Sequence, residues 1–275
     1  MSKKSQHAKY GKAQEEQEEL AALEELAADD EQDHDPIRVE LDPFFANGLI
    51  VDILYQVKSG KEATVYCCRA HPSTGVAYLA AKMYRSRNRR NFKNDAMYRE
   101  GRLVLDSHLR RAIKNKSMAG RSAEFSMWIN HEFETLTVLH KAGAAVPRPY
   151  EHSSSVIMME YMGDEQQAAP ALQHVALGPQ ETRHVFDQLI TNIQLWLSHN
   201  YIHGDLSPYN ILYWQDHIRI IDFPQAIDPR FNGHAYNLLL RDIENVCKYA
   251  ARQGVERDAE QIAQSMWWKF RNARL

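Results

Sequence analysis

The chain has 275 residues, of which 44% are hydrophobic and 25% charged, so it can fill one large domain or two lobes and is not disordered throughout. It has no run of roughly 18 uncharged apolar residues and no apolar core in residues 1–11, so we expect neither a spanning helix nor a secretion signal and predict a cytoplasmic protein without membrane contact. The formal net charge is −3, but residues 1–35 carry −7 and residues 82–121 carry +10, so opposite charges are separated along the chain.

The first expected element is an acidic arm, residues 1–40. Residues 13–28 are rich in Ala, Glu, Gln and Leu, with leucines at helical spacing, but they hold too few apolar groups to form a core. We therefore predict a disordered arm that carries a transient helix.

A β-rich segment follows and is expected to form a small N-terminal lobe, residues 41–162. Turn-forming residues such as Ser59 and Gly60 separate short runs of β-type residues. The expected strands are residues 50–57, 64–68, 76–84 and 156–161. Apolar residues at helical spacing predict one long helix over 122–141, after the basic segment.

Helical periodicity dominates the rest of the chain, residues 163–275, which we expect to form a larger lobe. The expected helices are residues 179–200, 236–252 and 256–272, and the expected strands are residues 211–214 and 218–221. These patterns predict an α+β fold in which a small sheet lobe with one long helix meets a larger α-rich lobe near Met162.

The segment His-Gly-Asp-Leu-Ser-Pro-Tyr-Asn, residues 203–210, lies between a predicted helix and a strand pair. Asp205 and Asn210 are five residues apart, as in the catalytic loop of kinases, and Asp222 ends the second strand. Phosphoryl transfer needs a carboxylate beside the nucleophile and hard oxygen ligands for Mg²⁺. We therefore predict Asp205 as the catalytic base and Asn210 and Asp222 as metal ligands, with His203 as a packing support.

Lys82 lies in the third predicted strand, at the position of the kinase lysine that pairs with nucleotide phosphates and with a helix glutamate. Glu132 is the expected partner, because it lies on the inward side of the long helix next to Phe133. Glu134 points about 200° around that helix and is therefore less suitable.

The turn between the first two strands reads Lys-Ser-Gly-Lys-Glu-Ala, residues 58–63, and contains a single glycine. It is neither the kinase Gly-x-Gly-x-x-Gly loop nor a Walker loop. Its backbone N–H groups and Lys61 can still reach phosphates. Taken alone, however, the turn fits a plain β-hairpin better.

The chain resembles the RIO family of atypical serine/threonine protein kinases, in the branch with the signature Ser-Thr-Gly-Lys-Glu-Ala and of bacterial or archaeal size. The resemblance rests on Ser59–Ala63, Trp128–Glu132, Met159–Gly163, His203–Asn210 and Ile221–Ala226. Lys58 replaces the first Ser of the signature and Ser59 replaces the Thr. The matched segments span about residues 50–245.

This resemblance implies a two-lobed, protein-kinase-like fold, with residues 41–162 as the nucleotide-binding lobe and 163–275 as the catalytic lobe. It implies ATP with Mg²⁺, for which Mn²⁺ could substitute, and places adenine against the backbone of Glu160 and Met162. The residues expected to contact the nucleotide are Ser59, Gly60, Lys61, Lys82, Glu132, Glu160, Met162 and Asn210. It also implies that Asp222 can accept phosphate, which would give ATPase-like switching.

Three hypotheses remain open at this point. The first is a serine/threonine kinase that autophosphorylates and acts on an unknown protein substrate. The second is a small-molecule phosphotransferase of the aminoglycoside or choline kinase type, which shares the His-Gly-Asp-Leu style of loop. The third is a nucleotide-gated module that contacts ribosomal RNA or ribosomal precursors through the basic segment 82–121.

Overall fold

The computed structural model describes residues 36–85 and 117–275. The helix expected within residues 13–28 and most of the basic segment 82–121 lie outside the described residues. The chain divides into two compact units, residues 1–47 and 48–275. The arm and lobe boundaries expected at residues 40 and 162 stay predictions.

The described part of the first unit is a helix that the sequence patterns did not predict, α2 (Pro36–Ala46). Pro36 stands at its first position, where a missing N–H costs nothing. Pro43 lies inside the helix and obscured its helical pattern.

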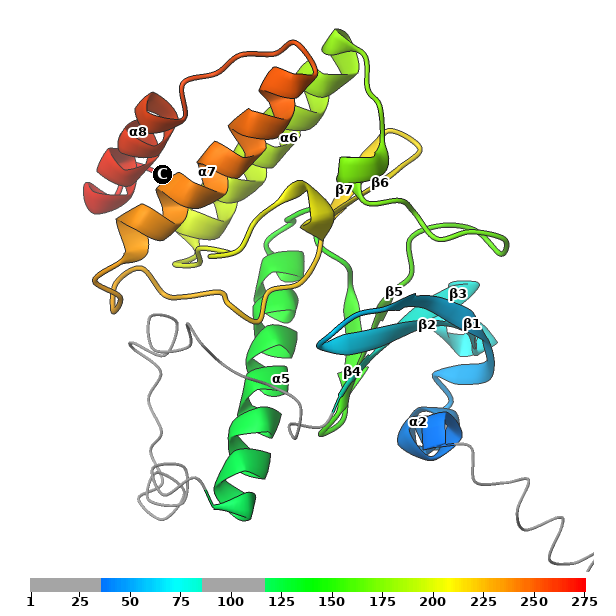
Figure 1. Cartoon of the computed structure of the whole chain (residues 1–275). Coiled ribbons are helices and arrows are strands. Elements are labelled where there is room, and N and C mark those ends of the chain that lie inside the picture. Colours follow the sequence, from blue (N-terminus) through cyan, green and yellow to red (C-terminus); the bar gives the residue numbers. More distant parts are fainter. Residues whose placement is uncertain (1–35, 86–116) are drawn as a thin grey trace, which may run out of the picture. The chain divides into compact units, whose positions relative to one another are not determined.

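The second unit begins with a five-stranded antiparallel sheet in the order β1-β2-β3-β5-β4 (Figure 1). Its strands are β1 (Ile50–Ser59), β2 (Ala63–Ala70), β3 (Tyr78–Tyr84), β4 (Pro149–His152) and β5 (Val156–Glu160). The four predicted strands are confirmed with small shifts at their ends. β4 was not predicted, because it has only four residues and starts at a proline, which is tolerated at a sheet edge.

The long predicted helix is present as α5 (Met118–Lys141), with Ser117 accepting the Gly120 N–H as its N-cap. It packs against β4 and β5. Its Trp128 and Ile129 join a core with residues of β3 and β5, whereas Leu136 and Leu139 belong to the core of the helical lobe. One helix therefore contributes to both hydrophobic cores.

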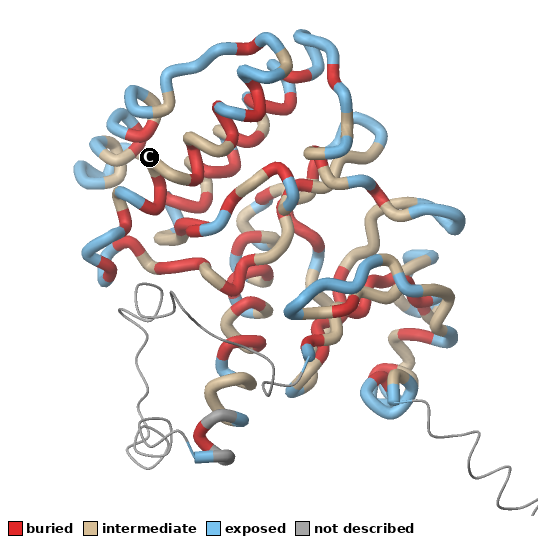
Figure 2. The backbone as a smooth tube through the Cα atoms, viewed as in Figure 1, coloured by how far each residue is buried: buried red, intermediate tan, exposed pale blue. Residues whose placement is uncertain are grey.

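The helical lobe contains α6 (Pro179–Ser198), α7 (Ala235–Arg252) and α8 (Ala259–Arg271), and α7 packs against both other helices. A two-stranded hairpin, β6 (Ile211–Trp214) and β7 (His217–Ile220), adds Ile211, Ile218 and Ile220 to the same core. Figure 2 shows buried positions recurring along these helices. The predicted α+β fold with a sheet lobe and a helical lobe is confirmed. No helix among the described residues combines the length and the apolar character needed to cross a membrane.

The segment after β5 turns sharply at Gly163, whose φ is +137°. A Cβ built there would lie 2.4 Å from the Gln167 carbonyl oxygen and 2.8 Å from the Ala168 Cα. Both neighbours are backbone atoms that cannot rotate away. The bridge between Gly163 and Ala168 therefore requires glycine at this position.

We predict that Gly163→Ala destabilises the protein more than Gly143→Ala does. Gly143 also has a positive φ, but a Cβ added there would meet no atom within 4 Å, so its replacement should cost only about 1–2 kcal/mol. Urea unfolding of both variants measures the difference. Equal losses of stability would show that the close approach at Gly163 is not a constraint.

Candidate active site

The centre of the site is the Lys82 ammonium on β3, which contacts two carboxylates. Its Nζ lies 2.7 Å from Glu132 Oε1 on α5 and 2.7 Å from Asp222 Oδ1 after β7. The predicted contact between Lys82 and Glu132 is present. The same lysine joins the sheet lobe to the segment that follows the hairpin of the helical lobe.

Glu132 is almost fully buried, with 1% of its side chain exposed. The Tyr84 hydroxyl donates to Glu132 Oε2, a contact that the sequence analysis did not anticipate. Desolvation raises the pKa of Glu132, and the opposing effect of Lys82 is smaller. Burial and the nearby Glu132 raise the pKa of Tyr84 well above its usual value, so its hydroxyl stays a donor.

The charges of Lys82 and Asp222 stabilise each other. Desolvation lowers the pKa of Lys82, but Asp222 and Glu132 together raise it well above its usual value. Desolvation raises the pKa of Asp222, yet the ion pair and hydrogen bond with Lys82 leave it below its usual value. Asp222 is therefore an anion and Lys82 a cation near neutral pH.

The backbone orients Asp222 by an unusual conformation, since its φ is +72°. The next residue, Phe223, is fully buried and packs on His203 with ring centroids 4.4 Å apart. On the other side, the Ile221 N–H donates to the Asn210 carbonyl at 2.9 Å. These contacts place Asp222 beside Asn210, as the sequence analysis expected.

His203 is 1% exposed and supports the loop of residues 203–210 by hydrogen bonds. Its Nδ1 accepts the Asp205 N–H at 3.3 Å, so its Nε2 carries the hydrogen that is donated to the Ile221 carbonyl at 3.2 Å. Burial lowers the pKa of His203 to about 4, so the ring is neutral at pH 7. This geometry agrees with a support role and leaves no free nitrogen for proton transfer.

Asp242 on α7 is a positioning residue that the sequence analysis missed. Its carboxylate accepts the Gly204 N–H at 2.8 Å and the Leu206 N–H at 2.9 Å, on either side of Asp205. Burial raises its pKa to about 7 despite the two backbone donors. The available signal was an acidic residue on the apolar face of an amphipathic helix, between Leu239 and Val246.

Asp205 itself is exposed at the turn of this loop. Partial desolvation raises its pKa, Arg241 opposes that shift, and the carboxylates of Asp222 and Glu62 add to it. A raised pKa suits a group that must accept a proton. The Asn210 Nδ2 donates to the Asp205 carbonyl at 3.0 Å, so the side-chain oxygen of Asn210 is the atom that would contact a metal ion.

The turn between β1 and β2 is closed by the Gly60 N–H, which donates to the Ala63 carbonyl at 2.9 Å. Arg85, not anticipated from the sequence, donates from its guanidinium to the Ser59 and Thr64 hydroxyls. Its backbone N–H donates to the Glu62 carbonyl at 3.0 Å. These contacts with Arg85, which directly follows β3, hold the turn in place. They also bring the Arg85 guanidinium close to Ser59.

Lys61 is exposed at this turn. Within residues 36–85 and 117–275, its ammonium makes no ion pair or hydrogen bond. The structure therefore leaves Lys61 available to a ligand and does not join it to Lys82.

Glu160 and Met162, whose backbone is expected to contact adenine, already make hydrogen bonds within the protein. The Glu160 N–H donates to the Arg148 carbonyl at 2.7 Å, and its carboxylate accepts from Arg219 at 3.3 Å. The Met162 carbonyl accepts the Ala169 N–H at 2.8 Å. An adenine ring at the expected place would have to use other backbone groups, such as the Met162 N–H.

The expected metal ligands fit Mg²⁺ by their chemistry. Within the described residues, no three His, Cys, Asp or Glu side chains converge on one point. Mg²⁺ at nucleotide sites, however, needs only one or two protein carboxylates besides phosphates and waters. The Asp222 carboxylate and the Asn210 amide oxygen supply hard oxygen ligands on adjacent segments.

The fold and the contacts of Lys82 are those of the protein-kinase-like class, and comparison with known proteins gives the family. The family model of the RIO domain matches residues 64–262, so the chain belongs to the RIO domain family. This match favours the RIO family over the aminoglycoside and choline kinase classes.

The relatives carry kinase names. The chain is 30% identical over 219 residues to the serine/threonine-protein kinase RIO1 of Chaetomium thermophilum, covering 76% of this chain and 41% of that protein. It is 29% identical over 136 residues to the RIO-type serine/threonine-protein kinase Rio1 of Thermoplasma acidophilum, covering 50% of this chain and 70% of that protein. The chain thus spans about two fifths of the length of the RIO1 relatives from Chaetomium thermophilum and Caenorhabditis elegans.

A similar solved structure is the Rio2 kinase from Chaetomium thermophilum, described as an ADP/Mg²⁺-phosphoaspartate complex. The TM-score is 0.58 with 20% sequence identity, covering 82% of this chain and 65% of that one. This likeness supports the two-lobed kinase-like fold.

We predict that Lys82→Met destabilises the protein by about 3–5 kcal/mol near neutral pH, because it leaves Glu132 buried without its cation. The folded-state pKa of Glu132 then lies above its unfolded value, so protonation at lower pH relieves the cost. Urea unfolding should therefore show a smaller loss at pH 5 than at pH 8. Lys141→Met, at the exposed end of α5, is the control and should change little.

Asp242→Asn should destabilise the protein by about 1–3 kcal/mol, since its amide NH₂ would face one of the two buried backbone donors. The folded-state pKa of Asp242 is about 7 and its ordinary value is 3.8, so its contribution to wild-type stability declines as pH rises between them. The stability gap between wild type and variant should narrow from pH 5 to pH 8. Asp187→Asn, at an exposed position of α6, is the control. A gap that is constant with pH would contradict the assigned titration.

Proposed function

We propose that this protein is an ATP- and Mg²⁺-dependent serine/threonine protein kinase of the RIO type that also autophosphorylates. The observation that carries the proposal is Lys82, held between Glu132 and Asp222 at 2.7 Å from each. An ammonium has three N–H donors, so Lys82 keeps one that could be donated to a phosphate oxygen. The kinase names of the relatives support the same activity.

The nucleotide would lie between the β1–β2 turn and the segment after β5. Ser59, Gly60 and Lys61 would contact phosphates, and the backbone near Glu160 and Met162 would contact adenine. Asn210 and Asp222 would hold Mg²⁺, which supplies charge neutralisation on the phosphates when bound. The exposed Lys61 and the nearby Arg85 guanidinium support a phosphate site at this turn.

In the transfer step, the oxygen of the acceptor hydroxyl forms a bond to the γ-phosphorus. Its proton passes to the Asp205 carboxylate, and the bond from the γ-phosphorus to the bridging oxygen breaks. ADP leaves with that electron pair. Asp242, through the Gly204 and Leu206 N–H groups, keeps Asp205 in place during this step.

A second candidate activity is transfer of the γ-phosphate to Asp222, followed by hydrolysis. The specific observation that favours it is the phosphoaspartate in the similar Rio2 kinase structure. Burial raises the pKa of Asp222, but Lys82 lowers it by more, so the carboxylate stays ionised. Its anionic oxygen could then act as a nucleophile. Its attack on the γ-phosphorus would release ADP, and water would then release phosphate from the aspartyl phosphate. The protein would act as an ATPase switch.

We predict that Asp205→Ala lowers serine phosphorylation from radioactive ATP and Mg²⁺ by about 100-fold or more, because the proton acceptor is lost. Nucleotide binding, measured by calorimetry, should be nearly unchanged. Asp187→Ala is the matched control at an exposed site of α6. Unchanged labelling in Asp205→Ala would remove Asp205 as the base.

Product analysis of the same reaction separates the two activities. Phosphoserine that disappears in Asp205→Ala indicates the kinase. A hydroxylamine-sensitive label and free phosphate that disappear in Asp222→Asn, but persist in Asp205→Ala, indicate the switch. Absence of all three products from the wild-type protein would refute both activities.

A further inference from the structure

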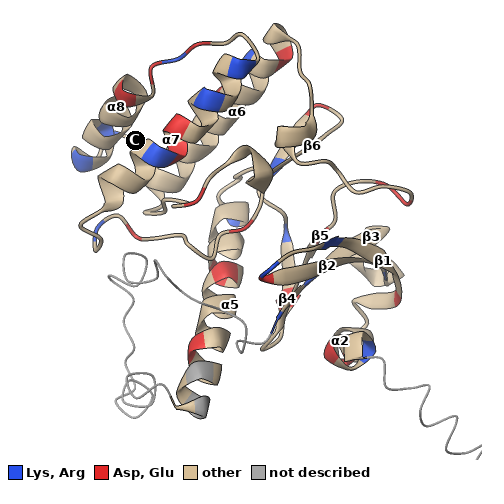
Figure 3. Cartoon of the chain, in the orientation of Figure 1, with Lys and Arg blue, Asp and Glu red and all other residues tan. Residues whose placement is uncertain are grey.

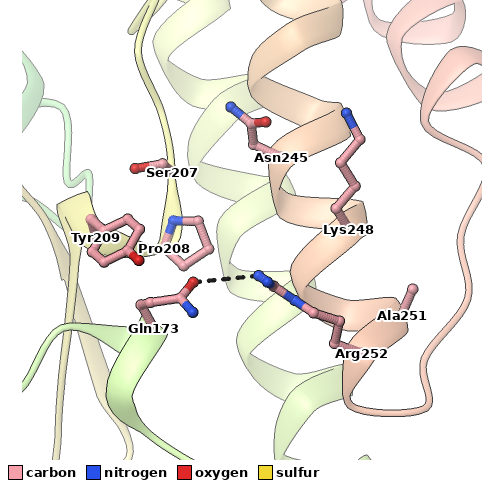
Figure 4. A pocket seen from close by; sticks show the side chains of 8 residues that line it. All are labelled: Gln173, Ser207, Pro208, Tyr209, Asn245, Lys248, Ala251 and Arg252. Carbon is pink, nitrogen blue, oxygen red and sulfur yellow. Dashed lines mark hydrogen bonds between the residues drawn. The ribbon is translucent and has the colours of Figure 1, made fainter.

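A pocket of about 590 Å³ lies on the helical lobe, lined in part by residues 207–209 of the loop that carries Asp205. Figure 4 shows the side chains that line it, which come from three segments, with Gln173 and Arg252 directed toward each other. Its lining residues are Gln173, Ser207, Pro208, Tyr209, Asn245, Lys248, Ala251 and Arg252. None of these residues is part of the nucleotide or metal site described above, although residues 207–209 lie between Asp205 and Asn210 in the sequence.

The pocket is joined to the loop that carries Asp205 by the chain itself and by a hydrogen bond. Ser207 follows Asp205 by two residues, and the Asn245 Nδ2 donates to the Leu206 carbonyl at 2.9 Å. α7 therefore has two roles, because Asp242 on its buried face holds the loop and its exposed face lines the pocket. A molecule in this pocket would contact the chain two residues after Asp205, at Ser207.

The pocket is cationic. It is lined by Lys248 and Arg252, one helical turn apart on α7, and by no acidic side chain. Lys248 lies 2.9 Å from Glu244, but the side chains are 67% and 40% exposed, and ion pairs at the surface are weak. Figure 3 shows charged residues of both signs along α6, α7 and α8. The positive charge is therefore a property of this pocket and not of the three helices as a whole.

Arg252 and its neighbours offer directional hydrogen bonds as well as charge. One Arg252 nitrogen donates to Gln173 Oε1 at 3.3 Å, the contact drawn in Figure 4, and Gln173 is neutral. Arg252 therefore keeps its full charge and further N–H donors. A guanidinium with an adjacent ammonium suits carboxylates, which it can bind through two parallel hydrogen bonds.

We propose that this pocket binds acidic side chains of a protein substrate, close to the acceptor serine or threonine. This inference rests on the proposed kinase activity. A peptide fits better than a nucleic acid, because Tyr209 is the single aromatic residue lining the pocket and base-stacking surfaces need more. Ser207, Pro208 and Tyr209 of the lining follow Asp205 in the same loop, which would bring the acidic residues of the peptide toward the hydroxyl that is phosphorylated.

The test compares two fluorescein-labelled peptides that differ only in the residues flanking one serine, Asp and Glu in the first and Asn and Gln in the second. Phosphorylation kinetics and fluorescence anisotropy are measured for each peptide at two salt concentrations. We expect wild-type protein to prefer the acidic peptide by about tenfold in kcat/KM, mainly through KM, and to lose part of this preference at high salt.

The Lys248→Glu/Arg252→Glu variant should abolish that preference. Arg183→Glu/Arg271→Glu changes the net charge equally at exposed positions on α6 and α8 outside the pocket, and it should keep the preference. If the charge reversal prevents folding, as judged by circular dichroism, Lys248→Gln/Arg252→Gln replaces it. Retention of the preference in the folded pocket variant, or its equal loss in the control, overturns the proposal.

Binding separates this inference from the proposed function. Asp205→Asn should bind the acidic peptide as wild type does while failing to phosphorylate it. If wild type phosphorylates neither peptide, the kinase proposal fails, and pocket-dependent binding of the acidic peptide still supports the pocket assignment. A single-stranded RNA of equal charge that binds more tightly, and only through Lys248 and Arg252, would overturn the assignment to a peptide.

Discussion

The structure depends on one buried cation that two carboxylates share. Lys82 meets Glu132, 50 residues away in sequence, and Asp222, 140 residues away, at 2.7 Å from each. Removing Lys82 would leave Glu132 buried without its cation, which is far more costly than keeping the group intact. The sheet, the long helix α5 and the segment after β7 must therefore be held in fixed positions relative to one another. Core packing achieves this, since α5 places Ile129 in the core of the sheet lobe and Leu136 and Leu139 in that of the helical lobe.

The same packing separates two aspartates into different chemical environments. Asp222 is paired with Lys82, which outweighs its desolvation and lowers its pKa. Asp205 is partly desolvated and close to other carboxylates, and its pKa is raised in spite of Arg241. Such a difference suits one group that stays charged and another that accepts a proton. α7 supports this arrangement from inside through Asp242, and its exposed side presents Lys248 and Arg252 to the pocket proposed for a peptide.

Much of this arrangement could be predicted from the sequence. The order of strands and helices followed from periodicity and turn residues, and the choice of Glu132 over Glu134 followed from the helical repeat. The spacing of Asp205, Asn210 and Asp222 alone points to one site. The short elements were missed, because four residues starting at Pro149 or a helix containing Pro43 give too little periodic signal.

The sequence by itself determined which elements form and which residue types carry the chemistry, because both depend on spacing within a few turns or strands. Only the tertiary structure decided the partners that come from distant segments. No local pattern indicates the contacts of Tyr84 with Glu132 or of Arg85 with Ser59. The place of Asp242 on the apolar face of α7 is a local signal, but it does not identify the Gly204 and Leu206 backbone as its partners. The cationic pocket likewise exists only because the exposed face of α7 packs beside residues 207–209 and Gln173. These contacts depend on burial and hydrogen bonding between residues far apart in the sequence, so the local propensity of a segment does not predict them.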